Sequence, residues 1–375
     1  MPTLKIVHTE SHRSWGGQES RVLNECLWMK KNGHRVWLAA PRRSQLYARA
    51  KAAGLAVWPM AFDNLSAASD YIGLRRRLKA VAPSVLNTHG NMDAKVGLMA
   101  ARGLSIPCIV RSRHHSHPVS PGWYNKWMYR HLSHYIFPPA RAVGDQIVRD
   151  LGVEPAKVVT VASGIVPPDE PVSRETAVRR MRNAFALDQN ARFVGSVAML
   201  RDWKGHRHLL AAFALISGAF PRHHLIIVGD GDERAALEAQ ARACGLGGRI
   251  HFTGFMEDPW PCFSAFDLDV LASTKNEGIP QVLLQAMYAG CPVIGTRVGG
   301  IPDIVADGLT GWLAPPSDAA ALAEAMAAIL NDPQEAQARA RRASQFVADH
   351  HTIDAMGRRI IDLYRRIIPG GGDRE

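Results

Sequence analysis

Residues 276–310, NEGIPQVLLQAMYAGCPVIGTRVGGIPDIVADGLT, form the stretch that decides the fold. A loop with one acid, Glu277, leads into a run from Gln281 whose apolar residues recur at helical spacing. An apolar strand over 292–296 and a double-glycine turn at 299–300 follow. A helix that starts beside such a strand offers an anion its free N–H groups and the positive end of its dipole. The stretch therefore predicts a diphosphate site at the edge of a parallel sheet, with Glu277 accepting hydrogen bonds from nearby hydroxyls.

The same stretch resembles the C-terminal signature of the retaining glycosyltransferases of family 4, in which seven residues separate two Glu residues. The matching positions are Glu277, Gly278, Pro280, Ala286, Gly290, Pro292, Val293, Ile294, Gly299 and Gly300. Gln285 stands where the family has its second Glu, which bonds the ribose of the nucleotide; an amide donates and accepts hydrogen bonds but carries no charge. The resemblance implies a donor-binding set of Gly278, Ile279, Pro280, Gln281 and Gln285.

The resemblance also implies an α/β protein with the GT-B fold, in which two Rossmann-like parallel-sheet domains face a central cleft. Apart from it, apolar strands alternate with amphipathic helical segments, which is typical of parallel sheets covered by helices on both faces. With 375 residues, two domains are expected. We predict an N-terminal acceptor-binding domain over 1–168 and a nucleotide-sugar domain over 172–350. Within 351–375, a C-terminal helix is expected to cross back to the N-terminal domain.

Composition limits the cellular setting. Hydrophobic residues make up 47% of the chain and charged residues 21%, which is typical of a globular protein with an ample core. The five cysteines are scattered without a CxxC pair, which favours reduced thiols. Lys5 and Ile6 lead straight into a predicted strand, so no signal peptide is expected, and no apolar run approaches the ~18 residues that span a bilayer. A cytoplasmic protein is predicted.

The net charge of +11 is concentrated in the N-terminal half. Residues 1–170 hold 23 Lys and Arg against 11 Asp and Glu, whereas the rest of the chain holds 22 against 23. An anionic membrane face, an acidic acceptor or nucleic acid would each be attracted to such a surface, and a surface that only aids solubility would look the same. The basic residues come without a nucleic-acid recognition motif, so no nucleic acid is expected as a partner.

An aromatic and basic segment, PGWYNKWMYRHLSHYIF, spans residues 121–137. At helical spacing its Trp123, Trp127 and His134 would share one face. That face either packs in the core or lies at a membrane interface, with the Trp rings at headgroup depth and Lys126 near lipid phosphates. Members of the resembling family often act on lipid-linked acceptors, so peripheral attachment to the cytoplasmic face of the inner membrane is a hypothesis.

Two features of the N-terminal half point to the carboxyl edge of the first predicted sheet. Gly16 and Gly17 follow the first strand and open a helix, as in a loop that lets a phosphate approach, although the pattern is not GxGxxG. His89 and the pair His114-His115 end two further strands. In the family the glycine loop faces the donor diphosphate and the acceptor, and a His near this position contacts the transferred sugar. We favour His114 for that contact, and His115 stays open.

The second half repeats the pattern with cations in the first loop. After the strand over 193–199 come Arg201 and Lys204, which suit a diphosphate clamp. The family carries an Arg and a Lys five residues apart here; Lys204 matches, Met199 stands at the Arg position, and Arg201 is near enough to serve.

Two further segments match the family's donor site. Gly229 and Gly231 fit a turn where small residues let the nucleotide approach the backbone. Phe255 and Met256 stand where the family makes backbone contacts to the base.

These residues predict transfer of a sugar from a nucleoside diphosphate to a hydroxyl of a glycan or a lipid-linked acceptor. Lys204, Arg201 and the helix N–H groups would stabilise the leaving diphosphate, and Glu277 would orient the sugar. No metal and no cofactor are expected, because these cations do that work and the DxD triplet at 267–269 falls in a predicted apolar strand. Retention, a UDP- or GDP-linked donor and a role in lipopolysaccharide or other cell-surface polysaccharide biosynthesis are implied by the resemblance alone.

Two other classes of function stay open. A GT-B epimerase would share the nucleotide half and would need acid–base carboxylates in the N-terminal domain, for which Glu10, Glu19 and Asp93 are candidates. A non-catalytic nucleotide-sugar binder is suggested by the departures at Gln285 and Met199.

Overall fold

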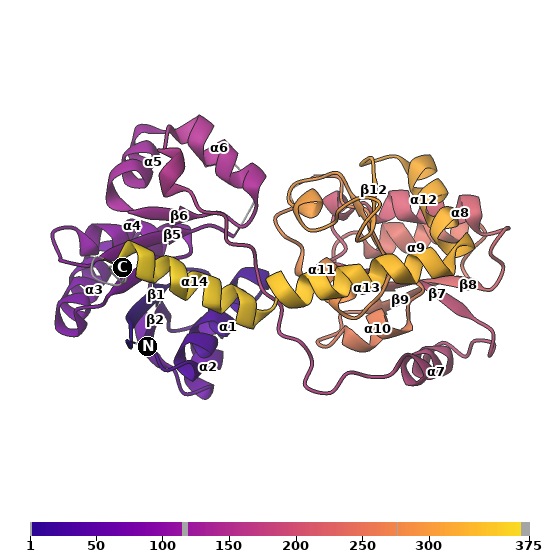
Figure 1. Ribbon diagram of the computed structural model, residues 1–375, viewed down its shortest axis with the longest axis horizontal. Helices are drawn as coiled ribbons and strands as arrows, with labels where there is room; N and C mark the ends of the chain where they lie inside the picture. Colours follow the sequence, from indigo (N-terminus) through magenta and orange to yellow (C-terminus); the bar gives the residue numbers. More distant parts are fainter. Residues whose placement is uncertain (1, 115–118, 276, 369–375) are drawn as a thin grey trace, which may run out of the picture. The chain divides into compact units, whose positions relative to one another are not determined.

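The computed structural model describes residues 2–114, 119–275 and 277–368. The chain forms two compact units (Figure 1). Unit 1 runs from the N-terminus to Val166 and includes the last helix, which begins at Ile353. Unit 2 spans Pro167–Thr352.

Unit 1 is built on a six-stranded parallel sheet with the strand order β3-β2-β1-β4-β5-β6. Its strands are β1 (Lys5–Thr9), β2 (Arg35–Pro41), β3 (Ala56–Met60), β4 (Val85–Thr88), β5 (Cys108–Ser112) and β6 (Tyr135–Phe137). Its helices are α1 (Gly17–Lys31), α2 (Gln45–Ala52), α3 (Ala67–Val81), α4 (Asn91–Ala101), α5 (Trp123–Trp127), the π-helix η1 (Met128–Leu132), α6 (Arg141–Leu151), the 3₁₀ turn η2 (Pro155–Lys157) and α14 (Ile353–Ile367). The central strands are buried end to end, as expected of a parallel sheet covered on both faces.

Unit 2 repeats this plan with the order β12-β11-β10-β7-β8-β9. Its strands are β7 (Arg192–Val197), β8 (His223–Val228), β9 (Ile250–Gly254), β10 (Leu268–Leu271), β11 (Val293–Thr296) and β12 (Trp312–Ala314). Its helices are α7 (Arg174–Ala184), η3 (Asp202–Lys204), α8 (His206–Ile216), α9 (Arg234–Ala243), α10 (Trp260–Ala265), α11 (Gln281–Tyr288), η4 (Ile301–Asp303), α12 (Ala319–Asn331) and α13 (Pro333–His350). Counted from its first strand, each unit therefore adds strands to its sheet in the same order.

Each sheet therefore has a switch point. The second and third strands lie on one side of the first strand, and the fourth to sixth strands lie on its other side. In unit 1 it lies between β1 and β4, and in unit 2 between β7 and β10. In open α/β sheets, ligands bind beyond the carboxyl ends of the strands at such a point, because the connecting loops diverge there and leave a crevice. The topology therefore predicts a ligand site in the loops at each of these two switch points.

The last helix, α14, completes the core of unit 1. Tyr364 is fully buried, and its hydroxyl accepts a hydrogen bond from Asn87 Nδ2 at 2.9 Å. The indole N–H of Trp28 donates to Asp354 at 2.5 Å. A Cβ on Gly357 would lie 2.3 Å from the Trp28 ring, so only glycine permits this approach. The helix is thus fitted to strands that lie far away in the sequence.

The structure differs from the sequence-based expectation in several segments, among them the helices α10 and α13, which were not predicted. Residues 121–137 do not form one helical face, because the helical part ends at Leu132 and Tyr135–Phe137 pairs with β5 as a strand. His134 is therefore not on the face of Trp123. The helix α7 was not expected, and the strand expected over 157–161 forms only a single bridge, between Ile136 and Val158. None of the described helices combines the length and apolar character needed to span a bilayer.

Candidate functional site

The switch point of unit 2 holds a buried ion pair. Lys204, at the end of η3 after β7, places its Nζ 2.6 Å from Oε1 of Glu277, which follows β10. Ser273 donates its hydroxyl to the same carboxylate oxygen at 2.5 Å. Glu277 is 5% exposed, so the pair interacts in a medium that screens charge less than water does. An acid and a cation from two loops thus meet where the sheet topology places a ligand.

Two glycines hold these loops against one another. Gly205, just after Lys204, has φ +70°, and a Cβ there would lie 1.9 Å from the carbonyl oxygen of Ala272. Gly299 has φ +55°, and a Cβ there would lie 2.0 Å from the carbonyl oxygen of Glu277. Residues other than glycine rarely adopt either backbone conformation, and their Cβ atoms would collide with these carbonyl oxygens. The position of Glu277 therefore depends on the double-glycine turn more than twenty residues later.

The helix α11 begins beside Glu277 and supplies N–H groups. Its N-cap is Pro280, and no side chain among the described residues caps it. The first N–H groups of a helix have no partners within the helix, so those from Gln281 onward can bind an anion. Gly278 and Ile279 precede the cap, and Gln285 lies one turn into the helix, half-buried.

The remaining residues predicted for unit 2 lie in neighbouring loops. The guanidinium of Arg201 is paired with the carboxylate of Asp232, a partner that the sequence did not suggest. Gly229 has φ +140° and Gly231 φ +158°, and a Cβ on either would overlap a backbone carbonyl of the 198–200 loop. The two glycines are thus needed to bring this turn close to the loop that carries Arg201.

Phe255 and Met256 follow β9. The N–H of Gly229 donates to the carbonyl of Gly254 at 2.9 Å, which joins their loop to the glycine turn. Phe255 is 78% exposed and Met256 37%, so their backbone is within reach of a ligand.

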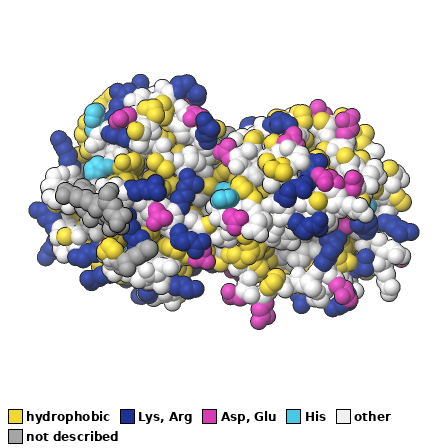
Figure 2. Space-filling model, in the orientation of Figure 1, with side chains coloured by type: hydrophobic (Ala, Val, Ile, Leu, Met, Phe, Trp, Pro, Cys, Tyr) yellow, Lys and Arg dark blue, Asp and Glu magenta, His cyan; other side chains and the backbone are white. Residues whose placement is uncertain are grey.

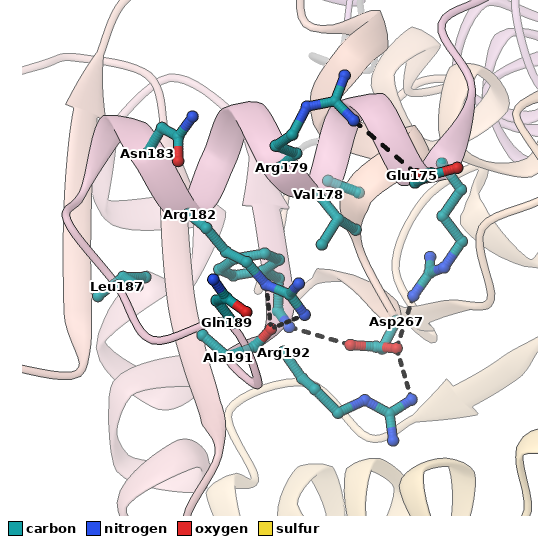
Figure 3. Close-up of a pocket in the computed structure, with 13 residues that line it drawn as sticks. Glu175, Val178, Arg179, Arg182, Asn183, Leu187, Gln189, Ala191, Arg192 and Asp267 are labelled. Atoms are coloured by element: carbon teal, nitrogen blue, oxygen red, sulfur yellow. Dashed lines mark hydrogen bonds and ion pairs between the residues drawn. The ribbon is translucent and has the colours of Figure 1, made fainter.

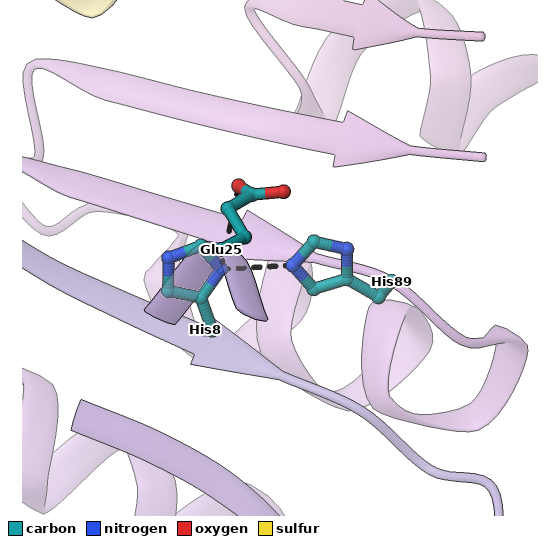
Figure 4. Close-up of side chains that lie close together, drawn as sticks. All are labelled: His8, Glu25 and His89. Carbon is teal, nitrogen blue, oxygen red and sulfur yellow. Dashed lines mark hydrogen bonds and ion pairs between the residues drawn. The ribbon is translucent and has the colours of Figure 1, made fainter. Parts of the chain in front are cut away.

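The switch point of unit 1 holds a chain of histidines. His8 Nδ1 and His89 Nε2 are 2.9 Å apart, and His89 Nδ1 and His114 Nε2 are 2.8 Å apart, with the rings stacked (Figure 4 shows the first pair). Burial lowers the pKa of His8 to about 3 and also lowers that of His89. Both imidazoles are therefore neutral at pH 7, and the link between His8 and His89 is a hydrogen bond between neutral rings. His115 lies outside the described residues, so the choice between it and His114 stays a prediction.

The carboxylates of unit 1 are buried around these histidines. Glu25 Oε1 lies 4.0 Å from His8 Nδ1, and burial raises the pKa of Glu25 to about 7, with Arg21 opposing the shift. Glu10 also has its pKa raised to about 7, by burial and by the nearby Asp93. His8, Glu25 and His89 are close enough to hold a metal ion, but the facing nitrogens of His8 and His89 point at one another at hydrogen-bond distance. His8 and His89 are better described as a hydrogen-bonded pair, with Glu25 beside His8 but with no hydrogen bond from its Oε1 to any described residue (Figure 4).

The glycine loop of unit 1 is conformationally unremarkable. Gly16 caps the N-terminus of α1 with an extended backbone, and a Cβ on Gly17 would meet nothing within 4 Å. The side chain of Glu19 reaches back to His12, with Oε1 and Nδ1 2.9 Å apart. Gly17 is thus not required by sterics within unit 1, whereas a Cβ on Gly16 would lie 3.3 Å from Oε2 of Glu19.

Comparison with known proteins decides the family. The model of glycosyl transferases group 1 matches residues 178–346, and the model of glycosyltransferase family 4 matches residues 15–167. Between them they account for most of both units. The chain belongs to this glycosyltransferase family.

Curated relatives of the chain are named as glycosyltransferases of different substrates and pathways. A 2-deoxystreptamine glucosyltransferase of Streptomyces kanamyceticus is 31% identical over 215 residues, 56% of this chain and 55% of the relative. The lipopolysaccharide core biosynthesis glycosyltransferase LpsE of Rhizobium meliloti is 29% identical over 195 residues, 52% of this chain and 54% of the relative. The chain thus spans about half the length of the curated relatives it matches.

Solved structures share the fold over the whole chain. A glycosyltransferase of Rickettsia africae has a TM-score of 0.88 at 15% identity, covering 99% of this chain and 100% of that one. HepE of Anabaena, crystallised with UDP and glucose, has a TM-score of 0.79 at 20% identity, covering 96% and 99%. The predicted GT-B fold is confirmed in its two parallel-sheet domains. The expected cleft between them stays a prediction.

A pocket of about 710 Å³ in unit 2, away from the Lys204–Glu277 pair, is unsuited to the donor (Figure 3). It is rich in arginine, but its Arg174 and Arg192 both bind Asp267 at 2.7 Å, and Arg182 donates to the carbonyl of Ala191. It also lies at the amino ends of β7 and β10, opposite to the edge where such sheets bind ligands. Asp267, the first acid of the DxD triplet, thus has a structural role in binding these arginines.

Proposed function

We propose that this chain transfers a sugar from a nucleoside diphosphate to an acceptor hydroxyl. The observation that supports it most is the buried Lys204–Glu277 pair beside the N-terminus of α11, at the switch point of unit 2. It combines a cation and free N–H groups for a diphosphate with an acceptor for sugar hydroxyls in one place. The family membership and the fold both agree with this chemistry.

The charges suggest a division of roles. When the glycosidic bond breaks, negative charge grows on the leaving diphosphate, and prearranged donors that face this charge lower the barrier. Lys204 and the first N–H groups of α11 are placed for this, and Arg201 reaches it by exchanging Asp232 for phosphate. Glu277, fixed by Ser273, orients the sugar through its hydroxyls. Because these groups carry the charge, the proposal needs no metal and no cofactor, and activity should survive EDTA.

The finer assignments rest on the relatives. HepE binds UDP and UDP-glucose, which supports a UDP-linked donor, with GDP as the alternative. LpsE and the galactosyltransferase WaaB act in the lipopolysaccharide core by their names, which supports a role in cell-surface glycan synthesis. Retention of the anomeric configuration is proposed from the family, and proton NMR of the product's anomeric signal tests it.

The decisive experiment is calorimetric binding of UDP, GDP and ADP to the full chain. We expect one nucleotide to bind, and Lys204→Gln to weaken it about 10- to 100-fold, because a charge-assisted hydrogen bond to phosphate is lost. Arg341→Gln is the matched control, since Arg341 is exposed on α13. Binding that is equal in both variants would place the nucleotide elsewhere and remove the proposal.

We further propose that α5 contacts the membrane surface. Trp123 is 80% exposed, and no residue of α5 is buried, so the helix offers an aromatic and basic surface that the core does not use. Figure 2 shows Lys and Arg side chains scattered over the visible face rather than gathered into one patch, so the aromatic side chains must supply the anchor. Flotation with anionic vesicles tests this: Trp123→Ala should reduce binding several-fold, and Ile72→Ala, which replaces another exposed apolar side chain, on α3, should not.

A further inference from the structure

A pocket of about 410 Å³ opens at the carboxyl edge of the sheet in unit 1. Its basic lining residues are Lys95, Arg111, Arg113, His12, His89 and His114. None of the described residues that line it is Asp or Glu. The pocket therefore carries positive charge without an acid in its wall.

Arg111 is the least expected of these side chains. It is 2% exposed, and its Nη1 donates to the carbonyl oxygens of Thr88 at 3.2 Å and Ser112 at 3.0 Å. Its Nη2 donates to Asn91 Oδ1 at 3.2 Å, and its Nε has no hydrogen-bond partner among the described residues. All of these partners are neutral. A buried guanidinium without a counter-ion is costly, and an anion entering the pocket would supply one.

The side chain of Tyr129 lies beside the same positive charge. Its ring is 2% exposed in the wall of the pocket, next to Arg111 and Arg113. Burial by itself raises the pKa of a phenol, but the two guanidinium groups outweigh it and lower the pKa of Tyr129. The positive charge at this wall thus favours the ionised form of Tyr129 and would likewise favour a bound anion.

Two acids beside the pocket already accept hydrogen bonds, and a third, Glu19, is bonded to the lining residue His12, with Oε1 and Nδ1 2.9 Å apart. Glu10 accepts from Gln18 Nε2 at 2.5 Å and from two backbone N–H groups of its own loop. Asp93 accepts from Thr9 Oγ1 at 2.7 Å and from the N–H of His89 at 3.0 Å. Neither carboxylate is paired with Arg111.

We infer that this pocket binds a phosphate or carboxylate group, and that the acceptor substrate carries it. The planar fork of a guanidinium matches both groups, and Lys95 adds a mobile charge at the pocket wall. That the anion belongs to the acceptor rests on the proposed function. That an anion binds in unit 1 does not, since it depends only on Arg111 and its surroundings.

Calorimetry with inorganic phosphate at constant ionic strength tests the site in the full chain. We expect Arg111→Gln to abolish the binding and Lys95→Gln to weaken it about three- to tenfold. Lys95 is exposed, so Lys95→Gln should fold normally even if Arg111→Gln does not fold. Lys79→Gln is the matched control, because Lys79 is also exposed, on α3. Phosphate that binds equally to the Lys95 and Lys79 variants but is lost in Lys204→Gln would overturn the inference, because it would then occupy unit 2.

Two further ligands identify the source of the anion. Binding of malonate instead of phosphate would assign a carboxylate, and binding only to vesicles with phosphatidic acid, weakened by Lys95→Gln, would assign a lipid-linked phosphate. No binding of any of the three would overturn the inference. If the full chain binds phosphate but does not bind UDP, GDP or ADP, the result would count against the proposed donor site and leave the anion site of unit 1 unaffected.

Discussion

The two units have sheets with the same strand order, yet they place opposite kinds of polar group at the corresponding edge. Unit 2 pairs a cation with an acid, Lys204 with Glu277. At the edge of unit 1, His8 and His89 are neutral imidazoles, and the buried Arg111 donates hydrogen bonds to neutral groups. In unit 2 the charge of Lys204 is thus offset by Glu277 before a ligand binds. In unit 1 the charge of Arg111 is not offset by an acid among its hydrogen-bond acceptors. The shared topology fixes where a ligand binds, while the loop residues decide which charge it brings.

The largest expected effect is on the balanced edge. Glu277→Ala should lower kcat/KM about 10²- to 10³-fold, because the sugar loses an orienting acceptor and Lys204 loses the group that fixes it. Glu324→Ala, exposed on α12, should leave activity unchanged. Steady-state rates with the donor identified by calorimetry give the measurement. An equal loss of kcat/KM in the Glu277 and Glu324 variants would mean that the Lys204–Glu277 pair has no specific role in the reaction.

The two glycine loops predicted to face the donor provide the next test, since sterics require Gly299 in unit 2 but not Gly17 in unit 1. Gly299→Ala should destabilise the protein by about 1–3 kcal/mol and weaken nucleotide binding, because its Cβ meets the carbonyl of Glu277 at 2.0 Å at a positive φ. Gly17→Ala in unit 1 meets nothing within 4 Å and should keep the melting temperature. Thermal unfolding of both variants, with and without nucleotide, checks the contrast.

The buried acid of unit 1 gives a smaller, pH-dependent effect. Burial raises the pKa of Glu25 to about 7, above the ordinary value of 4.5, so the unfolded chain releases this proton first and stability falls as pH rises from about 4.5 to 7. Glu25→Gln should remove that decline, which is worth about 2.5 kcal/mol between pH 5 and pH 8. Urea unfolding at pH 5 and pH 8 measures it. A decline of the same size in the variant would show that Glu25 is not its source.

The smallest effect concerns the helix that closes unit 1. Tyr364→Phe should cost about 1 kcal/mol, because Asn87 Nδ2 keeps its place but loses its acceptor. The ring itself, stacked on Phe137, is retained. Tyr71→Phe, half-buried on α3, is the control for removing a hydroxyl. Chemical denaturation resolves a difference of this size.

Local patterns were enough to predict most of the fold. Strands and helices of both units follow the apolar periodicity, and Lys204 and Glu277 each stand in a short recognisable loop. The helix α7 was missed because only its Ala177 and Met181 are buried, although Ser173, whose side chain accepts from the N–H of Thr176, is a cap signal that could have revealed it. The single helix expected over 121–137 was wrong because a three-residue strand is too short to show a period.

Contacts between distant strands were beyond sequence reasoning. The chain from His8 through His89 to His114 depends on the register of β1 against β4, in which His8 pairs with Asn87. The burial of Arg111 within its strand is likewise invisible in one sequence, because a strand-end arginine usually faces solvent. Ser273, four residues before Glu277 after an apolar strand, carried a weak signal that was not used.

The placement of α14 in unit 1 has a consequence for how the protein is made. Strands β1 to β6 leave the ribosome long before residues 353–367, since all of unit 2 is synthesised in between. Until then the apolar surface around Trp28 and Phe137 lacks its cover, while unit 2 already has every strand and helix it needs. The later domain should therefore fold first, and the earlier one should wait, open to chaperones, for the end of the chain.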